Sequence, residues 1–236
     1  MTTSDRPRAI TFDAGQTLVE LDTAMLSARL GERGVACTAA ALERALPGAW
    51  KHHEAAVAAG AKHPWKEMMT ALLEGAVVAG SAPHVDWLFD QQPTRNLWRR
   101  PVEGMRMLVE ELHAARVPMA VLSNSEGRLE ELLVELDWAR LFVAIADSGR
   151  LGVSKPDPGI FAWTCERLGV AAEDVVHIGD SREADVEGAI AAGLRAVWFG
   201  PAARDLGDPR VVACADATAL RRQLVAWRVL DGGRNA

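Results

Sequence analysis

A short apolar run that stops at a glycine and an aspartate constrains the fold of this chain more than any other feature. The run 175–178 is rich in β-branched residues and is typical of a buried strand, and Gly179-Asp180 ends it. A helix-like stretch follows from 183 to 193. This pattern places Asp180 and Asp185 at the carboxyl end of a strand, where open α/β sheets bind their ligands.

Five such apolar runs occur along the chain, with helical patterns between the later ones. They are Arg8–Phe12, Val117–Leu122, Phe142–Ala146, Val175–Ile178 and Ala196–Phe199, and a final helix is expected over about 217–227. Alternation of strands and helices favours right-handed crossovers and a mostly parallel sheet. The sequence therefore predicts an α/β fold.

Residues from about 22 to 96 interrupt this alternation, because they contain no good strand run and are rich in helix formers. A block of this length is too long for a simple crossover, so we expect an inserted all-helical domain at 22–96. Residues 1–21 and 97–236 would then form the sheet domain. Four histidines of the helical block, His52, His53, His63 and His84, are expected to be ordinary surface residues.

Polar side chains follow the other predicted strands in the same way. Asp13 comes directly after the first run, Ser123 and Asn124 follow the second, and Lys155 lies in a stiff loop flanked by prolines. Taken singly, each is more often a cap, turn or surface residue. Their occurrence in this order along the chain, together with the pair Asp180 and Asp185, instead predicts a hard-cation site or a nucleophile beside a metal.

Together these segments resemble the motifs of the haloacid dehalogenase-like (HAD) hydrolase superfamily, whose members are mostly phosphatases. The matching segments are Phe12–Leu18, Leu122–Asn124, Lys155–Phe161, and Gly179–Asp185 with Gly188-Ala189 and Ala192-Gly193. Their order and spacing agree over residues 8 to about 200. The resemblance implies a Rossmann-like parallel sheet flanked by helices, with an all-helical cap domain inserted between the first two motifs.

The resemblance also implies the catalytic roles. Asp13 would be the nucleophile that forms an aspartyl-phosphate, and Ser123 and Lys155 would act in catalysis. Ser123, Asn124 and Lys155 would bind the phosphoryl group of the substrate.

A magnesium ion is implied as the cofactor. Its protein ligands would be Asp13, Asp180 and the backbone oxygen of Gly15, because Mg²⁺ favours octahedral oxygen sites. Asp185 would hold a metal-bound water or orient Lys155.

Gly15 is the one departure from the superfamily pattern, in which the first motif usually reads Asp-x-Asp. In phosphatases of the superfamily the second Asp protonates the leaving oxygen and then activates water, and glycine does neither. General acid–base help is typically worth about 10²–10⁴ in rate, so we expect slow turnover rather than none.

A carbon–halogen hydrolase of the haloacid dehalogenase type is an alternative function. Such members also lack the second Asp, but they tend to carry a Tyr two positions after the nucleophile, and this chain has no tyrosine. Displacing a halide needs no metal, so the retained pair Asp180 and Asp185 weighs against this alternative.

A second alternative is a catalytically weakened protein that binds a phosphate ligand. Gly15 favours it, whereas retention of Asp13, Ser123 and Lys155 weighs against it. Magnesium-dependent hydrolysis of a small phosphorylated metabolite is the function that the sequence favours.

The composition of the chain limits the kinds of partner that it could bind. The net charge is −6 and no dense Lys/Arg block occurs, so we expect no nucleic acid. No apolar stretch approaches the roughly 20 residues that span a bilayer, and residues 1–8 are too polar for a signal peptide. Three widely spaced cysteines are typical of reduced thiols. We therefore expect a cytoplasmic protein, monomeric or homodimeric, with a small phosphate ester as its substrate and no membrane partner.

Overall fold

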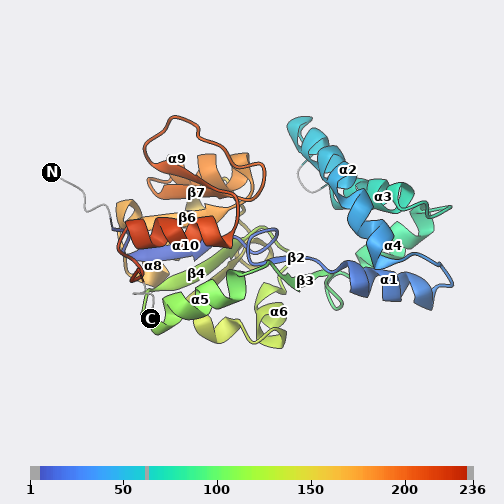
Figure 1. Cartoon of the computed structure of the whole chain (residues 1–236), viewed down its shortest axis with the longest axis horizontal. Coiled ribbons are helices and arrows are strands. Elements are labelled where there is room, and N and C mark those ends of the chain that lie inside the picture. Colours follow the sequence, from blue (N-terminus) through green and yellow to red (C-terminus); the bar gives the residue numbers. More distant parts are fainter. Residues whose placement is uncertain (1–5, 62–63, 233–236) are drawn as a thin grey trace. The chain divides into compact units, whose positions relative to one another are not determined.

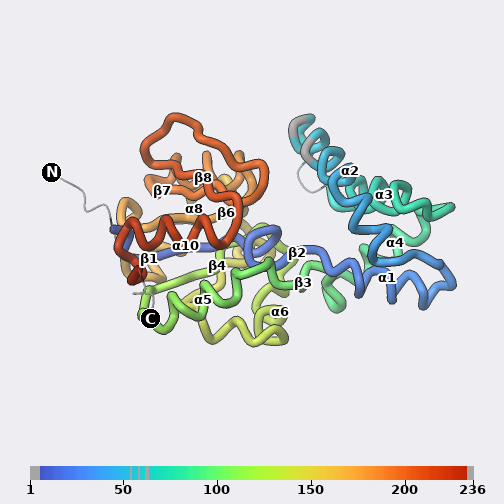
Figure 2. Tube along the Cα trace, viewed as in Figure 1, coloured from blue at the N-terminus to red at the C-terminus, as the bar shows by residue number. Residues whose placement is uncertain are grey.

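The computed structural model describes residues 6–61 and 64–232, apart from the side chains of residues 54 and 58, and the chain divides into two compact units. One unit consists of the chain up to Glu20 and from Arg99 onward, and the other is Leu21–Trp98. His63 lies outside the described residues, whereas His52 is exposed and His53 and His84 are half-buried. Figure 2 traces the chain through both units.

Six parallel strands form the sheet of the first unit (Figure 1). They are β1 (Ala9–Phe12), β4 (Met119–Ser123), β5 (Ala144–Asp147), β6 (Val175–Gly179), β7 (Arg195–Phe199) and β8 (Val211–Cys214), in the order β5-β4-β1-β6-β7-β8. All five neighbouring pairs are parallel. The expectation of an α/β fold with a mostly parallel sheet is therefore confirmed.

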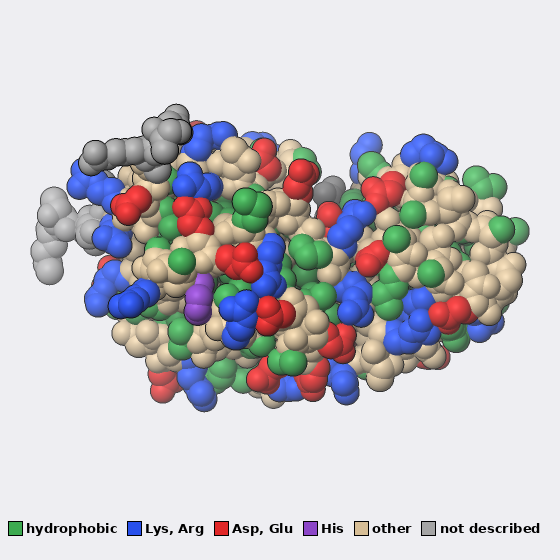
Figure 3. Space-filling view, turned by 60° about the horizontal axis from the view of Figure 1, so that its bottom comes forward, with side chains coloured by type: hydrophobic (Ala, Val, Ile, Leu, Met, Phe, Trp, Pro, Cys, Tyr) green, Lys and Arg blue, Asp and Glu red, His purple; other side chains and the backbone are tan. Residues whose placement is uncertain are grey.

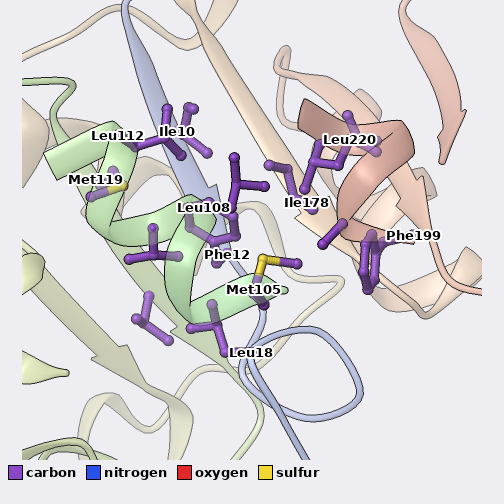
Figure 4. Close-up of a cluster of buried hydrophobic side chains, with 14 of the residues drawn as sticks. Ile10, Phe12, Leu18, Met105, Leu108, Leu112, Met119, Ile178, Phe199 and Leu220 are labelled. Carbon is purple, nitrogen blue, oxygen red and sulfur yellow. The ribbon is translucent and has the colours of Figure 1, made fainter. Parts of the chain in front are cut away.

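Helices cover both faces of this sheet. On one face lie α5 (Met105–Ala114), α6 (Leu129–Glu135) and α10 (Ala217–Ala226), and on the other α8 (Pro158–Leu168) and α9 (Gly188–Ala191). Figure 4 shows the first face, where Ile10, Phe12 and Ile178 pack against Leu108 of α5 and Leu220 of α10. Short helical turns complete the unit: η1 (Ala139–Leu141), α7 (Ser148–Leu151), η2 (Ala172–Asp174) and the π-helix η3 (Arg182–Glu187).

Strand alternation sends neighbouring residues to opposite faces. Ile10 and Phe12 of β1 point towards α5, so Thr11 points towards α8. In β6, His177 likewise faces α8, where its ring meets the ring of Phe161. Two polar side chains are thus buried within an otherwise apolar layer.

The second unit has its own hydrophobic core. Its helices are α1 (Thr23–Glu32), α2 (Ala39–Ala58), α3 (Trp65–Gly75) and α4 (Ala82–Gln91). Leu26, Leu72 and Leu88 are fully buried in that core, and side chains of Asp22 and Thr38 cap the starts of α1 and α2. The chain passes between the two units along the paired strands β2 (Val19–Leu21) and β3 (Trp98–Pro101).

Some elements differ from the expectation. Three strands were not predicted from the sequence: β8, β2 and β3, each only three or four residues long. The stretch 183–193, expected as one helix, divides into the π-helix η3 and the short α9.

Charged side chains of both signs are mixed on the surface of the molecule (Figure 3). On the face shown in Figure 3, Lys and Arg side chains are interspersed with Asp and Glu rather than gathered into one basic field. Among the described residues, none of the helices combines the length and the apolarity that crossing a bilayer requires.

Candidate active site

Three adjacent strands bring the predicted residues to one edge of the sheet. Asp13 follows β1, Ser123 ends β4 and Asp180 follows β6, and β1 pairs with both of the other strands. Because the strands are parallel, their carboxyl ends meet at the same edge.

Asp13 receives two hydrogen bonds on a single oxygen. The Ser123 hydroxyl donates to Asp13 Oδ1 at 2.9 Å, and the Lys155 ammonium donates to the same atom at 2.5 Å. All three side chains are buried. The carboxylate is therefore fixed in orientation by donors that could also contact a group bound beside it.

Lys155 is held at both its side chain and its backbone. Its Nζ lies 2.5 Å from Asp13 Oδ1 and 2.6 Å from Asp185 Oδ1, so one ammonium joins two carboxylates. The side-chain amide of Asn124 accepts from the Lys155 N–H at 2.8 Å and donates to the Lys155 carbonyl at 3.0 Å. These two bonds hold the Asn124 side chain against the Lys155 backbone, so Asn124 fixes the position of the loop that carries the lysine.

Asp185 lies in the π-helix η3, and both its oxygens are engaged. Oδ1 meets Lys155 Nζ and His177 Nε2, the latter at 3.0 Å, and Oδ2 accepts from the Ser181 N–H at 2.8 Å. A Cβ at Gly179 would overlap this carboxylate, so the glycine at the end of β6 makes room for it.

The site carries an excess of negative charge. Oxygens of Asp13, Asp180 and Asp185 lie within 4.8 Å of one another, which is a spacing that could hold a metal ion. Burial, with the charges of Asp185 and Asp13, raises the pKa of Asp180 well above its ordinary value. Burial also raises the pKa of Asp13, against the opposing charge of Lys155.

Lys155 and Asp185 form an ion pair, and each stabilises the charged form of the other. Burial alone would raise the pKa of Asp185, but Lys155 and the His177 hydrogen bond hold it below its ordinary value. Burial alone would lower the pKa of Lys155, but Asp13 and Asp185 raise it. A cation bound beside Asp13 and Asp180 would relieve the remaining repulsion.

Gly15 lies two residues after Asp13, where its backbone forms a single bridge with Val19. Gln16 follows with a φ of 56°, and its N–H donates to the Val19 carbonyl at 2.7 Å. The structure thus places the Gly15 backbone in a tight turn directly after Asp13, and its role as a metal ligand stays a prediction.

Five of the predicted residues, Asp13, Ser123, Lys155, Asp180 and Asp185, converge at this edge, and Asn124 joins them through the Lys155 backbone. Sequence reasoning gave no role to Thr11 or His177, which contact each other at 2.9 Å beneath the site. A polar residue inside a strand that is otherwise apolar was the signal that could have identified them.

The family of the chain follows from its sequence. The family model for haloacid dehalogenase-like hydrolases matches residues 7–193. The chain therefore belongs to the haloacid dehalogenase-like hydrolases.

Among its relatives, the chain is 36% identical over 110 residues to a phosphoserine phosphatase from Thermus thermophilus, over 42% of this chain and 44% of that protein. It is 28% identical over 195 residues to a phosphoglycolate phosphatase from Xanthomonas campestris pv. campestris, over 81% and 82% of the two chains. The matched region thus spans less than half the length of the phosphoserine phosphatase.

Among solved structures, the chain resembles the putative HAD-hydrolase YfnB from Bacillus subtilis, crystallised bound to magnesium. The TM-score is 0.65 over 93% of this chain and 99% of that one, at 21% identity. At this identity the likeness establishes the fold.

The raised pKa of Asp180 predicts that this carboxylate destabilises the metal-free protein. Its folded pKa exceeds the unfolded value, so its contribution to stability is lost as the pH rises from about 4 through the folded pKa. In chelator at neutral pH, Asp180→Asn should therefore raise Tm, by about 2–4 °C for ~1 kcal/mol. The advantage should shrink as the pH falls.

Thermal melts at several pH values measure this effect, with Asp90→Asn as the control that removes an exposed charge remote in sequence from the cluster. An Asp180→Asn protein no more stable than the wild type at neutral pH would contradict the repulsion described above.

Gly179→Ala should destabilise the sheet unit, because the new Cβ would overlap the Asp185 carboxylate. We expect a loss of about 1–3 kcal/mol in the free energy of unfolding. Gly48→Ala is the control, since Gly48 lies inside α2 and a Cβ there would meet no atom within 4 Å beyond its chain neighbours and the backbone of its own helix. That change should be neutral or stabilising by about 0.5–1 kcal/mol. Denaturant unfolding of both variants tests the difference, and equal effects would contradict it.

Proposed function

We propose that this chain is a magnesium-dependent phosphatase that acts on a small phosphorylated metabolite through an aspartyl-phosphate on Asp13. The observation that carries the proposal is the Lys155 ammonium, 2.5 Å from the Asp13 carboxylate, beside an acidic cluster suited to a divalent cation. The names of the two phosphatase relatives support the same class of reaction.

In the proposed reaction a carboxylate oxygen of Asp13 attacks phosphorus, and the bond from phosphorus to the leaving oxygen breaks with its electron pair. Water then opens the aspartyl-phosphate, releasing inorganic phosphate and restoring the carboxylate. Asp13 is suited to this role because the strand end and its two donors hold it in one orientation.

Lys155 and Ser123 would stabilise the transferring group. A lysine ammonium has three donors, and Asp13 and Asp185 occupy two of them, so the third is available for a phosphoryl oxygen. Ser123 would donate its hydroxyl to another oxygen once the substrate displaces its bond to Asp13. Asn124 would contribute its backbone to binding the substrate.

Mg²⁺ is the proposed cofactor, bound by Asp13, Asp180 and the Gly15 carbonyl. The donor set is all oxygen, as Mg²⁺ prefers. Asp185, whose oxygens are already engaged by Lys155, His177 and Ser181, is better suited to orienting Lys155 than to binding the ion directly. When bound, the ion supplies charge neutralisation for the phosphate dianion near Asp13.

The helical unit, with expected bounds 22–96, is proposed as the cap that sets substrate specificity. A capped site favours a small substrate, because water must be excluded around it. A cytoplasmic location and a monomeric or homodimeric state stay predictions.

An assay with an aryl phosphate tests this function. Phosphate release should require Mg²⁺, and Asp13→Asn should abolish it, because an amide cannot form the aspartyl-phosphate. Asp216→Asn is the control, since an asparagine can still cap α10. If Asp13→Asn keeps more than about a tenth of the wild-type rate, Asp13 is not the nucleophile. Metal-free halide release from a haloacid would instead support a dehalogenase, and metal binding with neither activity would support a phosphate-ligand-binding protein.

Gly15 predicts a steep dependence of turnover on the acidity of the leaving group, because the leaving oxygen departs without a general acid. Gly15→Asp should flatten that dependence and raise rates most for alkyl phosphates. Gly15 is not among the glycines of positive φ in the described chain, so an Asp can adopt its backbone conformation. Rates for a series of phosphate esters measure the slope. A folded Gly15→Asp protein with an unchanged slope would mean that another group already protonates the leaving oxygen.

A further inference from the structure

His177 is a fully buried histidine that the proposed reaction does not use. Its exposed fraction is 0%, and it lies in the middle of β6 on the face covered by α8. The Phe161 ring lies edge-on to it, with 5.4 Å between ring centroids and an interplanar angle of 90°. Packing therefore fixes the orientation of the imidazole ring, and both of its ring nitrogens are buried.

Both ring nitrogens have a partner. Nε2 lies 3.0 Å from Asp185 Oδ1, and Nδ1 lies 2.9 Å from the Thr11 hydroxyl. Asp185 is held ionised by Lys155, so it can only accept, and the proton of this contact must be on Nε2. The hydrogen-bond network thus assigns a proton to Nε2.

The hydrogen bond with the Thr11 hydroxyl indicates whether His177 Nδ1 carries a proton. Among the described residues, Nδ1 is the hydrogen-bond partner that the structure gives its hydroxyl, and Thr11 is fully buried. If Nδ1 were also protonated, the hydroxyl would have to accept, and its own proton would be left buried without an acceptor, which is costly. The hydroxyl therefore donates to an unprotonated Nδ1, and the ring is neutral.

These contacts form a closed circuit around the reacting carboxylate. Thr11 lies in β1 and Asp13 directly follows this strand, two residues further on. The side-chain contacts run from Thr11 through His177, Asp185 and Lys155 back to Asp13. Thr11 and His177 are also direct partners in the β1–β6 register. A displacement of the imidazole would move Asp185, and with it the ammonium beside Asp13.

We propose that Thr11 and His177 are positioning residues: the Thr11 hydroxyl fixes the Nε2–H tautomer of His177, which holds Asp185 and thereby aims Lys155 at the transferring group. The role in turnover rests on the proposed phosphatase function, whereas the tautomer and the position of Lys155 do not. Hydrogen-bond partners that orient active-site side chains from behind typically contribute about 10–100-fold to activity.

Nitrogen NMR of the metal-free protein tests the circuit without turnover. The His177 ring, assigned by the loss of its signals in His177→Gln, should show a protonated Nε2 and an unprotonated Nδ1. The ammonium resonance of Lys155 should shift in Thr11→Val and return in Thr11→Ser, which restores a hydroxyl. Thr164→Val is the matched control, because Thr164 is equally buried but donates to the Ile160 carbonyl within α8.

Kinetics with an aryl phosphate test the consequence. Thr11→Val should lower kcat by about 10–100-fold with little change in KM, because the lost interaction acts on the transition state, and Thr11→Ser should recover most of it. Thr164→Val should keep the wild-type kcat.

A proton on Nδ1 in the wild type would overturn the tautomer assignment. A Lys155 resonance that is unmoved in Thr11→Val, or that moves equally in Thr164→Val, would overturn the positioning role. A wild-type protein with the expected spectra but no phosphatase activity would remove the proposed function and leave the circuit intact.

Discussion

The site depends on one buried ammonium between two buried carboxylates. Lys155 contacts Asp13 at the end of β1 and Asp185 in the helix that follows β6, and these strands are neighbours in the sheet. A buried charge without a partner is strongly destabilising, so the lysine, both acids and the loop that carries the lysine must assemble together. Two hydrogen bonds between the Asn124 amide and the Lys155 backbone hold that loop beside the end of β4.

The same arrangement leaves a charge imbalance that the protein alone does not resolve. Three carboxylates lie within 4.8 Å of one another, and Lys155 neutralises only part of their charge. The result is the raised pKa of Asp180, a local strain of the kind that proteins concentrate at functional sites. The excess negative charge makes the strand ends receptive to a cation, and a cation there would attract a phosphate group.

Much of the fold and the convergence of the site residues could be predicted from local sequence, because strand ends and helix starts have local signals. The strand β8 was missed because it is four residues long and no helical pattern separates it from β7. The hydrogen bonds between the Asn124 amide and the Lys155 backbone were not predicted, because they join positions 31 residues apart and no local pattern encodes such a contact. His177 was visible as a polar residue in an apolar strand, but its partners depend on the β1–β6 register.

The most direct test of the account is the chemical state of Asp13 during turnover. The enzyme is mixed with an aryl phosphate and Mg²⁺, quenched in acid within the first turnovers and digested with pepsin at acid pH, where an acyl phosphate survives, and the peptide that contains Asp13 is sequenced by mass spectrometry. The account predicts a phosphoryl group on Asp13 that appears only with Mg²⁺ and substrate. Turnover of the substrate with an unmodified Asp13 at every quench time, or a phosphoryl group on another residue, would contradict it.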